Sequence, residues 1–209
     1  MLTLWGRNNS SNVMKVTWLL GELGLAHERI DAGLAFGRTA TPEYRAMNPL
    51  GVVPSLEDGD FRLFESNVIC RYLCTAYAPE NPIFPQDTKG RATVESWMDF
   101  QQTAISPIQA TVFQGLVRIA PEKRNWEAIH AAIARGNLVW GLLDERLSRQ
   151  DYIALHHFTI ADITFATHVH RWLNLDIPGR VEMPNLTKWY QRLCTRPAYV
   201  KHVVEIPMS

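Results

Sequence analysis

The chain changes character near residue 80, and this change constrains its fold more than any other feature. Up to Tyr77, short β-prone apolar runs alternate with segments of helical periodicity, whereas beyond it we find only helical patterns. A strand–helix–strand order builds parallel sheet, and a run of helices builds a bundle. We therefore predict an α/β domain at residues 1–78, a proline-rich linker at 79–87 and an all-α domain at 88–209.

The first domain is predicted to follow the order βαβ, a long loop, then ββα. Its turns carry the clearest signals, because Gly24 suits the end of a helix and Asp58-Gly59 suits a tight hairpin turn. The expected elements are a strand at 2–5, a helix at 13–23, a strand at 27–32, a hairpin of 53–56 with 61–64, and a helix from Ser66.

The second half is predicted to be a bundle of five helices. Pro107 should bend the first of them, because its ring removes a backbone donor. The expected helices run from about Thr88 to Leu116, from Trp126 to Leu147, from Thr159 onward, from Leu186 to Cys194, and from Pro197 onward.

Composition excludes several classes of protein. The 209 residues carry 21 Lys and Arg against 21 Asp and Glu, so no net field attracts nucleic acid or an anionic membrane. No apolar run approaches the ~20 residues of a transmembrane helix, and no secretory signal begins the chain. Three cysteines are too few for a disulfide framework, which indicates a cytoplasmic protein.

Val53-Pro54 is the first candidate binding feature. A proline that enters a strand is often preceded by a cis bond, which leaves the backbone of Val53 free to pair with a peptide-like ligand. The alternative is an edge-strand proline without a ligand.

Two helix starts are candidates for binding anions. Glu65-Ser66 opens one helix, where free N–H groups would take a carboxylate and Glu65 an ammonium group. Ser10, Ser11 and Asn12 open an earlier helix, where a hydroxyl could donate to an anionic sulfur or oxygen. Each is also consistent with an ordinary helix cap.

Taken together, these features resemble the cytosolic glutathione transferase superfamily. The resemblance covers nearly the whole chain, including Phe158-Thr159-Ile160-Ala161-Asp162 in the helical half, where Thr159 and Asp162 can form a capping box. The other matching stretches are Ser10-Ser11-Asn12 before a Val-x-x-Val helix, Glu22-Leu23-Gly24, Asn48-Pro49-x-Gly51-x-Val53-Pro54-x-Leu56 and Leu63-Phe64-Glu65-Ser66-Asn67.

The resemblance implies a thioredoxin-like first domain, a helical second domain and a homodimer that uses glutathione as cosubstrate, without metal or other cofactor. The chain looks like a bacterial member of the serine-type classes, such as theta, tau, delta and zeta. No tyrosine stands in the first strand and no cysteine precedes the first helix. Ser10 is the leading candidate for the catalytic hydroxyl, with Ser11 and Asn12 as alternatives.

By the same resemblance, Val53 and Pro54 would bind the cysteinyl part of glutathione, and Glu65 and Ser66 its γ-glutamyl end. Many relatives carry a long basic or amide residue just before the Val-Pro pair, where this chain has Val52. Arg7, Arg38 or another side chain would then take the glycyl carboxylate, or glutathione would bind weakly.

The implied reaction is attack of the glutathione thiolate on an electrophilic carbon of a hydrophobic small molecule, as in detoxification. Among the aromatic and aliphatic residues of the first long helix, Ile105 and Phe113 are candidates for the second-substrate pocket. The alternatives are a glutathione-dependent peroxidase or isomerase, or a non-catalytic protein that binds apolar ligands or another protein.

Overall fold

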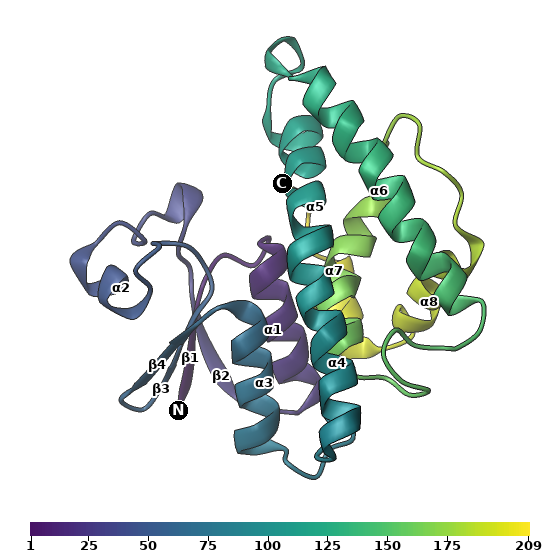
Figure 1. Cartoon of the computed structure of the whole chain (residues 1–209). Coiled ribbons are helices and arrows are strands. Elements are labelled where there is room, and N and C mark those ends of the chain that lie inside the picture. The colour runs from purple at the N-terminus through teal and green to yellow at the C-terminus, as the bar shows by residue number, and fades with distance from the viewer.

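A computed structural model describes all residues, Met1–Ser209, and places a small sheet beside a larger group of helices (Figure 1). The sheet has four strands in the order β2-β1-β3-β4, with β1 parallel to β2 and antiparallel to β3. The elements of this first half are β1 (Leu2–Trp5), α1 (Ser11–Glu22), β2 (His27–Ile30), α2 (Pro42–Met47), β3 (Ser55–Asp58), β4 (Phe61–Phe64) and α3 (Ser66–Tyr77).

The predicted βαβ and ββα units are confirmed, with one addition in the segment expected to be a long loop. That segment holds a 3₁₀ turn at Leu34–Phe36 and the short helix α2, so the prediction of a plain loop was wrong. The oxygen of Thr41 caps α2 by accepting from the N–H of Tyr44, and Pro42 follows at the first helical position. Six residues are too few for apolar periodicity to reveal such a helix, although its cap and proline were visible.

Two glycines at predicted turns adopt left-handed backbone conformations. Gly24 ends α1 with φ of 64°, and Gly59 turns the β3–β4 hairpin with φ of 59°. Both values lie in the left-handed region that glycine adopts without steric cost.

α1 is buried on almost every side. All eight residues from Val13 to Leu20 are buried, because α1 packs against α3 on one side and against the helices of the second half on the other. The contacts in the second half are with α7 (Ile160–Asn174), α9 (Pro197–Tyr199) and the π-helical turn at Val200–Val204. Figure 1 shows α1 and α3 standing between the sheet and the second half.

The second half is entirely helical, as predicted. Its elements besides α7 and α9 are α4 (Thr88–Phe100), α5 (Ser106–Phe113), α6 (Trp126–Leu147) and α8 (Pro184–Leu193). The first long helix is continuous from α4 into α5, and a π-helical turn at Gln101–Ile105 lies just before Pro107. The wider turn accommodates the missing N–H of the proline.

Asp162 organises the start of α7. Its two carboxylate oxygens accept from the N–H of Ile153, the N–H and hydroxyl of Thr159, and the indole N–H of Trp189, at 2.9–3.1 Å. The predicted capping box of Thr159 and Asp162 is therefore present, and Asp162 is fully buried within it.

Residues 79–87 contain no helix or strand, but this linker packs against the rest of the protein. Ile83 and Phe84 are buried, and the N–H of Ile160 donates to the carbonyl of Ile83 at 2.9 Å. None of the helices combines the length and the hydropathy that crossing a bilayer requires.

Candidate active site

The register of the sheet brings the three candidate motifs to one end of it. Trp5 at the end of β1 pairs with Ser55 at the start of β3, and Ser55 pairs with Phe64 at the end of β4. The segments beyond these residues therefore leave the sheet at the same edge. They carry Ser10, Val53-Pro54 and Glu65-Ser66 respectively.

Ser10 occupies the N-cap of α1 without using its hydroxyl as a cap. Its backbone is extended, with φ of −85° and ψ of 124°, and its side chain accepts no hydrogen bond from the first turn. The hydroxyl has no partner within the protein and borders a cleft that Ser11 and Asn12 also line. A serine at this position usually caps the helix, so the free hydroxyl is available to a ligand.

The Val53–Pro54 peptide bond is cis, as the motif suggested. Val53 lines the same cleft, and neither its backbone N–H nor its carbonyl has a hydrogen-bond partner in the protein. The residue before it is held in place, because the Tyr44 hydroxyl and the Asn48 amide both donate to the Val52 carbonyl, at 2.7 and 2.9 Å. A fixed backbone segment with unpaired N–H and carbonyl groups is suited to pairing with a peptide.

Glu65 and Ser66 lie at the start of α3 but are not among the residues that line the cleft. Glu65 is exposed and adopts a left-handed backbone, with φ of 71°, whereas Ser66 is buried. For a residue other than glycine this conformation is uncommon and often marks a functional site. Pro54 is buried behind Val53 and is likewise not a lining residue.

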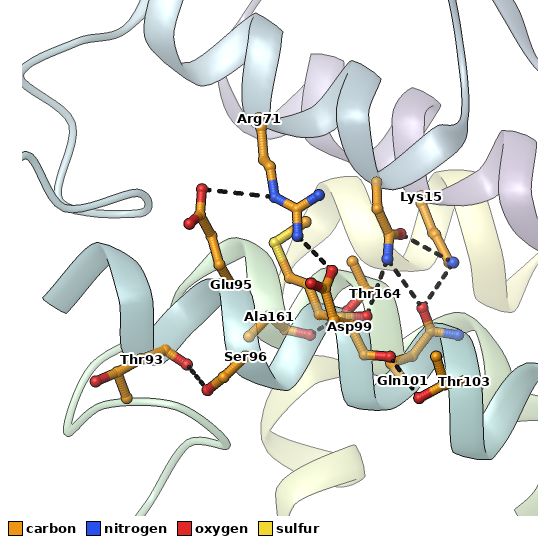
Figure 2. Close-up of polar contacts among 12 residues, drawn as sticks. Lys15, Arg71, Thr93, Glu95, Ser96, Asp99, Gln101, Thr103, Ala161 and Thr164 are labelled. Carbon is orange, nitrogen blue, oxygen red and sulfur yellow. Dashed lines mark hydrogen bonds and ion pairs between the residues drawn. The ribbon is translucent and has the colours of Figure 1, made fainter. Parts of the chain in front are cut away.

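Lys15 lies behind the site, and sequence reasoning did not single it out. Figure 2 shows its ammonium group between two amides: Nζ donates to Oδ1 of Asn67 at 3.1 Å and to Oε1 of Gln101 at 2.8 Å. Asn67 in turn donates to the carbonyl of Met98 at 3.0 Å. Complete burial lowers the pKa of Lys15 to about 7, while Cys70 and Glu65 act weakly in the opposite direction.

The cleft between the two halves has a volume of about 510 Å³. Only five of its eighteen lining residues are hydrophobic, and none is Asp or Glu. Phe113 lines the cleft, whereas Ile105 is fully buried in the core and does not reach it. The cleft is therefore more polar than the second-substrate pocket we expected from the sequence.

Three arginines line this cleft: Arg7 after β1, Arg118 beyond α5, and Arg171 on α7. Arg7 was a candidate from the sequence, whereas Arg118 and Arg171 were missed because neither lies in a motif. Arg38, the other candidate for the glycyl carboxylate, lines a separate hollow with Trp5 and Tyr44. No group of three or more His, Cys, Asp or Glu side chains is placed to hold a metal ion.

Two models of glutathione S-transferase domains match the chain, the N-terminal domain over residues 1–75 and the C-terminal domain over residues 116–197. Glutathione S-transferase GstB of Escherichia coli K12 is 40% identical over the full length of both chains. The chain belongs to the glutathione S-transferase family.

Other members of the family are similar to this transferase in sequence or structure over nearly the whole chain. Glutathione S-transferase 3 of Zea mays is 33% identical and covers 99% of this chain and 95% of its own. A crystal structure of the theta class glutathione S-transferase from Xanthomonas axonopodis pv. citri, with glutathione bound, superposes with a TM-score of 0.94. It is 39% identical and covers 100% of this chain and 99% of its own.

Proposed function

We propose that this transferase binds glutathione along Val53 and at the start of α3, and that Ser10 stabilises the thiolate. The thiolate attacks an electrophilic carbon of a hydrophobic small molecule held in the cleft. The observation that carries this proposal is the free hydroxyl of Ser10, which borders the cleft beside the unpaired backbone of Val53. Ser11 and Asn12, which line the same cleft, are the alternatives.

The energy required of this site is modest. A free thiol has a pKa near ~8.5, so holding most of it as thiolate at pH 7 requires a shift of about 2 units, or ~2.7 kcal/mol. A hydrogen bond to a charged acceptor contributes roughly 1.5–3 kcal/mol, and a partly exposed helix N-terminus adds up to ~1 kcal/mol. One serine hydroxyl at the start of α1 therefore suffices without a cofactor.

The γ-glutamyl end of glutathione is assigned to the start of α3. The free N–H groups of its first turn would bind the α-carboxylate, and the exposed carboxylate of Glu65 would bind the ammonium group. Arg7 borders the cleft on the same wall as Val53 and is our candidate for the glycyl carboxylate, in place of Val52.

Conjugation is favoured over thiol–disulfide chemistry by the positions of the cysteines. Cys70 and Cys74 are buried in α3, and burial raises the pKa of both thiols. None of the three cysteines lines the cleft. We further propose that the transferase acts in the cytoplasm as a homodimer, as the resemblance to the cytosolic superfamily implies.

Two measurements together test this proposal. Glutathione should raise the melting temperature in a concentration-dependent manner, because it binds the folded state alone. Purified protein should also accelerate the reaction of glutathione with 1-chloro-2,4-dinitrobenzene. Binding without turnover of this or other electrophiles would support the carrier alternative, and the absence of both effects would refute the proposal.

A further inference from the structure

We propose that the second substrate carries an anionic group, a carboxylate or a similar oxyanion, which the cleft binds through Arg118 and Arg171. The inference rests on the proposed conjugation of glutathione and narrows the chemical class of its acceptor.

The first support is the charge of the cleft. Arg7, Arg118 and Arg171 all line it, no acidic side chain does, and none of the three forms an ion pair with Asp or Glu. In a chain whose 21 basic and 21 acidic residues balance, this is a concentrated local excess of positive charge. Such a cleft attracts anions and disfavours cations.

Arg171 is the second support, because its charge is buried without a carboxylate partner. Its side chain on α7 is only 6% exposed, its Nη2 donates to the carbonyl of Asn9 at 2.7 Å, and its Nε has no partner. Burial, with Arg118 and Arg7 nearby, lowers the pKa of Arg171 to about 9, so it remains charged at neutral pH. A buried charge of this kind is stabilised when a ligand of opposite sign enters.

The two arginines flank Phe113, in a different part of the cleft from the Val53 segment that is assigned to glutathione. Arg118 and Arg171 lie over the ring of Phe113, with their guanidinium carbons 5.1 and 3.9 Å from its centre. All three residues come from the helical half of the protein, whereas Ser10 and Val53 come from the sheet half, and Arg171 reaches across to the Asn9 carbonyl beside Ser10. Glutathione held along Val53 leaves the guanidinium groups beside Phe113 for the other substrate.

Neighbouring polar groups complete the site. The amide of Gln109 and both ring nitrogens of His168 are buried at the cleft and have no partner in the protein. Burial and the charges of Lys15 and Arg171 lower the pKa of His168 well below its usual value, so its neutral ring offers one donor and one acceptor. Buried polar groups are seldom left unpaired, and an oxyanion would accept from such donors.

Arg118 also donates to the backbone oxygen of Ser209 at 3.0 Å. Asn9 holds the same residue, donating to the oxygen and the hydroxyl of Ser209 at 3.2 and 2.7 Å. Figure 1 shows the C-terminal end of the chain beside α5. Ser209 therefore holds Arg118 at the rim of the cleft, and Asn9 holds Ser209.

The test compares 4-chloro-3-nitrobenzoate with 4-chloro-3-nitrobenzamide, which differ in charge but have nearly the same shape. In both, the thiolate forms a carbon–sulfur bond to the ring and chloride leaves with the electron pair of the carbon–chlorine bond. For each acceptor, kcat/KM is divided by the rate constant of the uncatalysed reaction with glutathione. We expect the enhancement for the benzoate to exceed that for the benzamide by about tenfold, as charge-assisted hydrogen bonds would give.

Arg118→Met should reduce the ratio of the benzoate enhancement to the benzamide enhancement by about tenfold, since it removes one charge from the cleft. The matched control is Arg149→Met, which removes an exposed arginine paired with Glu145 outside the cleft, and it should leave the ratio unchanged. Melting temperatures with and without glutathione verify that each variant folds and binds.

Equal enhancement of the two acceptors in the wild type would overturn the proposal. So would a loss in Arg118→Met that is equal for both acceptors and accompanied by a higher KM for glutathione, because the arginine would then serve the cosubstrate. Both results leave the proposed function standing. If neither acceptor reacts and glutathione does not stabilise the protein, the proposed function fails and this inference fails with it.

Discussion

Nζ of Lys15 lies 2.8 Å from Oε1 of Gln101, and this contact joins the helix of the candidate active site to the helical half of the protein. The lysine is completely buried, and Asn67 is its other hydrogen-bond partner. The interface therefore buries an amine whose charged form loses its hydration when the protein folds. Such a charge makes stability depend on pH.

We expect the burial of Lys15 to make the protein more stable as the pH rises from 7 to 9. The pKa is about 7 in the folded state against 10.5 for the unperturbed side chain, so the unfolded state binds the extra proton in this range. Stability then rises with pH, by up to about 1.4 kcal/mol per unit. Lys15→Met should lack this slope, whatever its stability at one pH. Urea unfolding at pH 7, 8 and 9 measures it.

Lys89→Met is the control for that experiment, because it removes an exposed lysine from the start of α4. Its free energy of unfolding should follow the wild type at every pH. A Lys15→Met protein that also follows the wild-type slope would show that the buried group does not titrate in this range.

Ser10→Ala should lower kcat/KM for conjugation by roughly 10- to 150-fold, the equivalent of about 1.5–3 kcal/mol. The hydroxyl is the proposed donor to the thiolate, so the pKa of bound glutathione should rise by about one to two units in the same variant. Thiolate absorbance against pH measures it. The helix should persist, because this hydroxyl makes no capping hydrogen bond.

The matched controls for Ser10 are Ser11→Ala and Asn12→Ala, which alter the adjacent cleft-lining residues. We expect both to retain most of the activity. If either is severely impaired while Ser10→Ala is nearly normal, the thiolate donor is Ser11 or Asn12 rather than Ser10.

Glu65→Gln should raise KM for glutathione by about tenfold and leave kcat comparatively unchanged. The γ-glutamyl group stays away from the reacting sulfur, so its binding contributes equally to the ground state and the transition state. Glutathione should accordingly stabilise the variant much less than the wild type at one concentration.

Glu127→Gln controls for the loss of an acidic residue at a helix start, since Glu127 lies in the first turn of α6. Its stabilisation by glutathione should equal that of the wild type. Equal stabilisation in Glu65→Gln would mean that Glu65 only borders its helix and that the γ-glutamyl end binds elsewhere.

Asp162→Asn should cost about 3 kcal/mol, because the new amide N–H₂ would face donors where a carboxylate oxygen now accepts. For a protein of this size, such a loss lowers the melting temperature by roughly 6–12 °C. Asp60→Asn removes an equal charge from the exposed hairpin turn and should change the melting temperature little. Calorimetry of the two variants side by side gives the comparison.

Much of the architecture followed from local signals. Gly24, the Asp58-Gly59 turn and the Thr159–Asp162 capping box each specify their own conformation within a few residues, and the structure has all three. Ser10, Val53 and Glu65 became candidates for the same reason, since each lies in a short motif at the end of an element.

The contents of the cleft were not predictable in this way. Arg118 and Arg171 are distant in the sequence and meet at Phe113 only after α5 and α7 pack together. Lys15 was hidden for a related reason. A lysine in an apolar helix is expected to reach solvent, and its burial depends on amides supplied by α3 and by the segment after α4.

The burial of α1 on both sides has a consequence for how such a protein can be divided. The α1 helix packs against the sheet domain on one side and against α7 and α9 on the other. If the helical half is removed, the second apolar face of α1 is exposed to water. We expect residues 1–78 expressed alone to aggregate rather than to bind glutathione. The two halves are thus interdependent parts of one folding unit. A chimera that takes its helical half from a relative would need the outer face of α1 from the same relative.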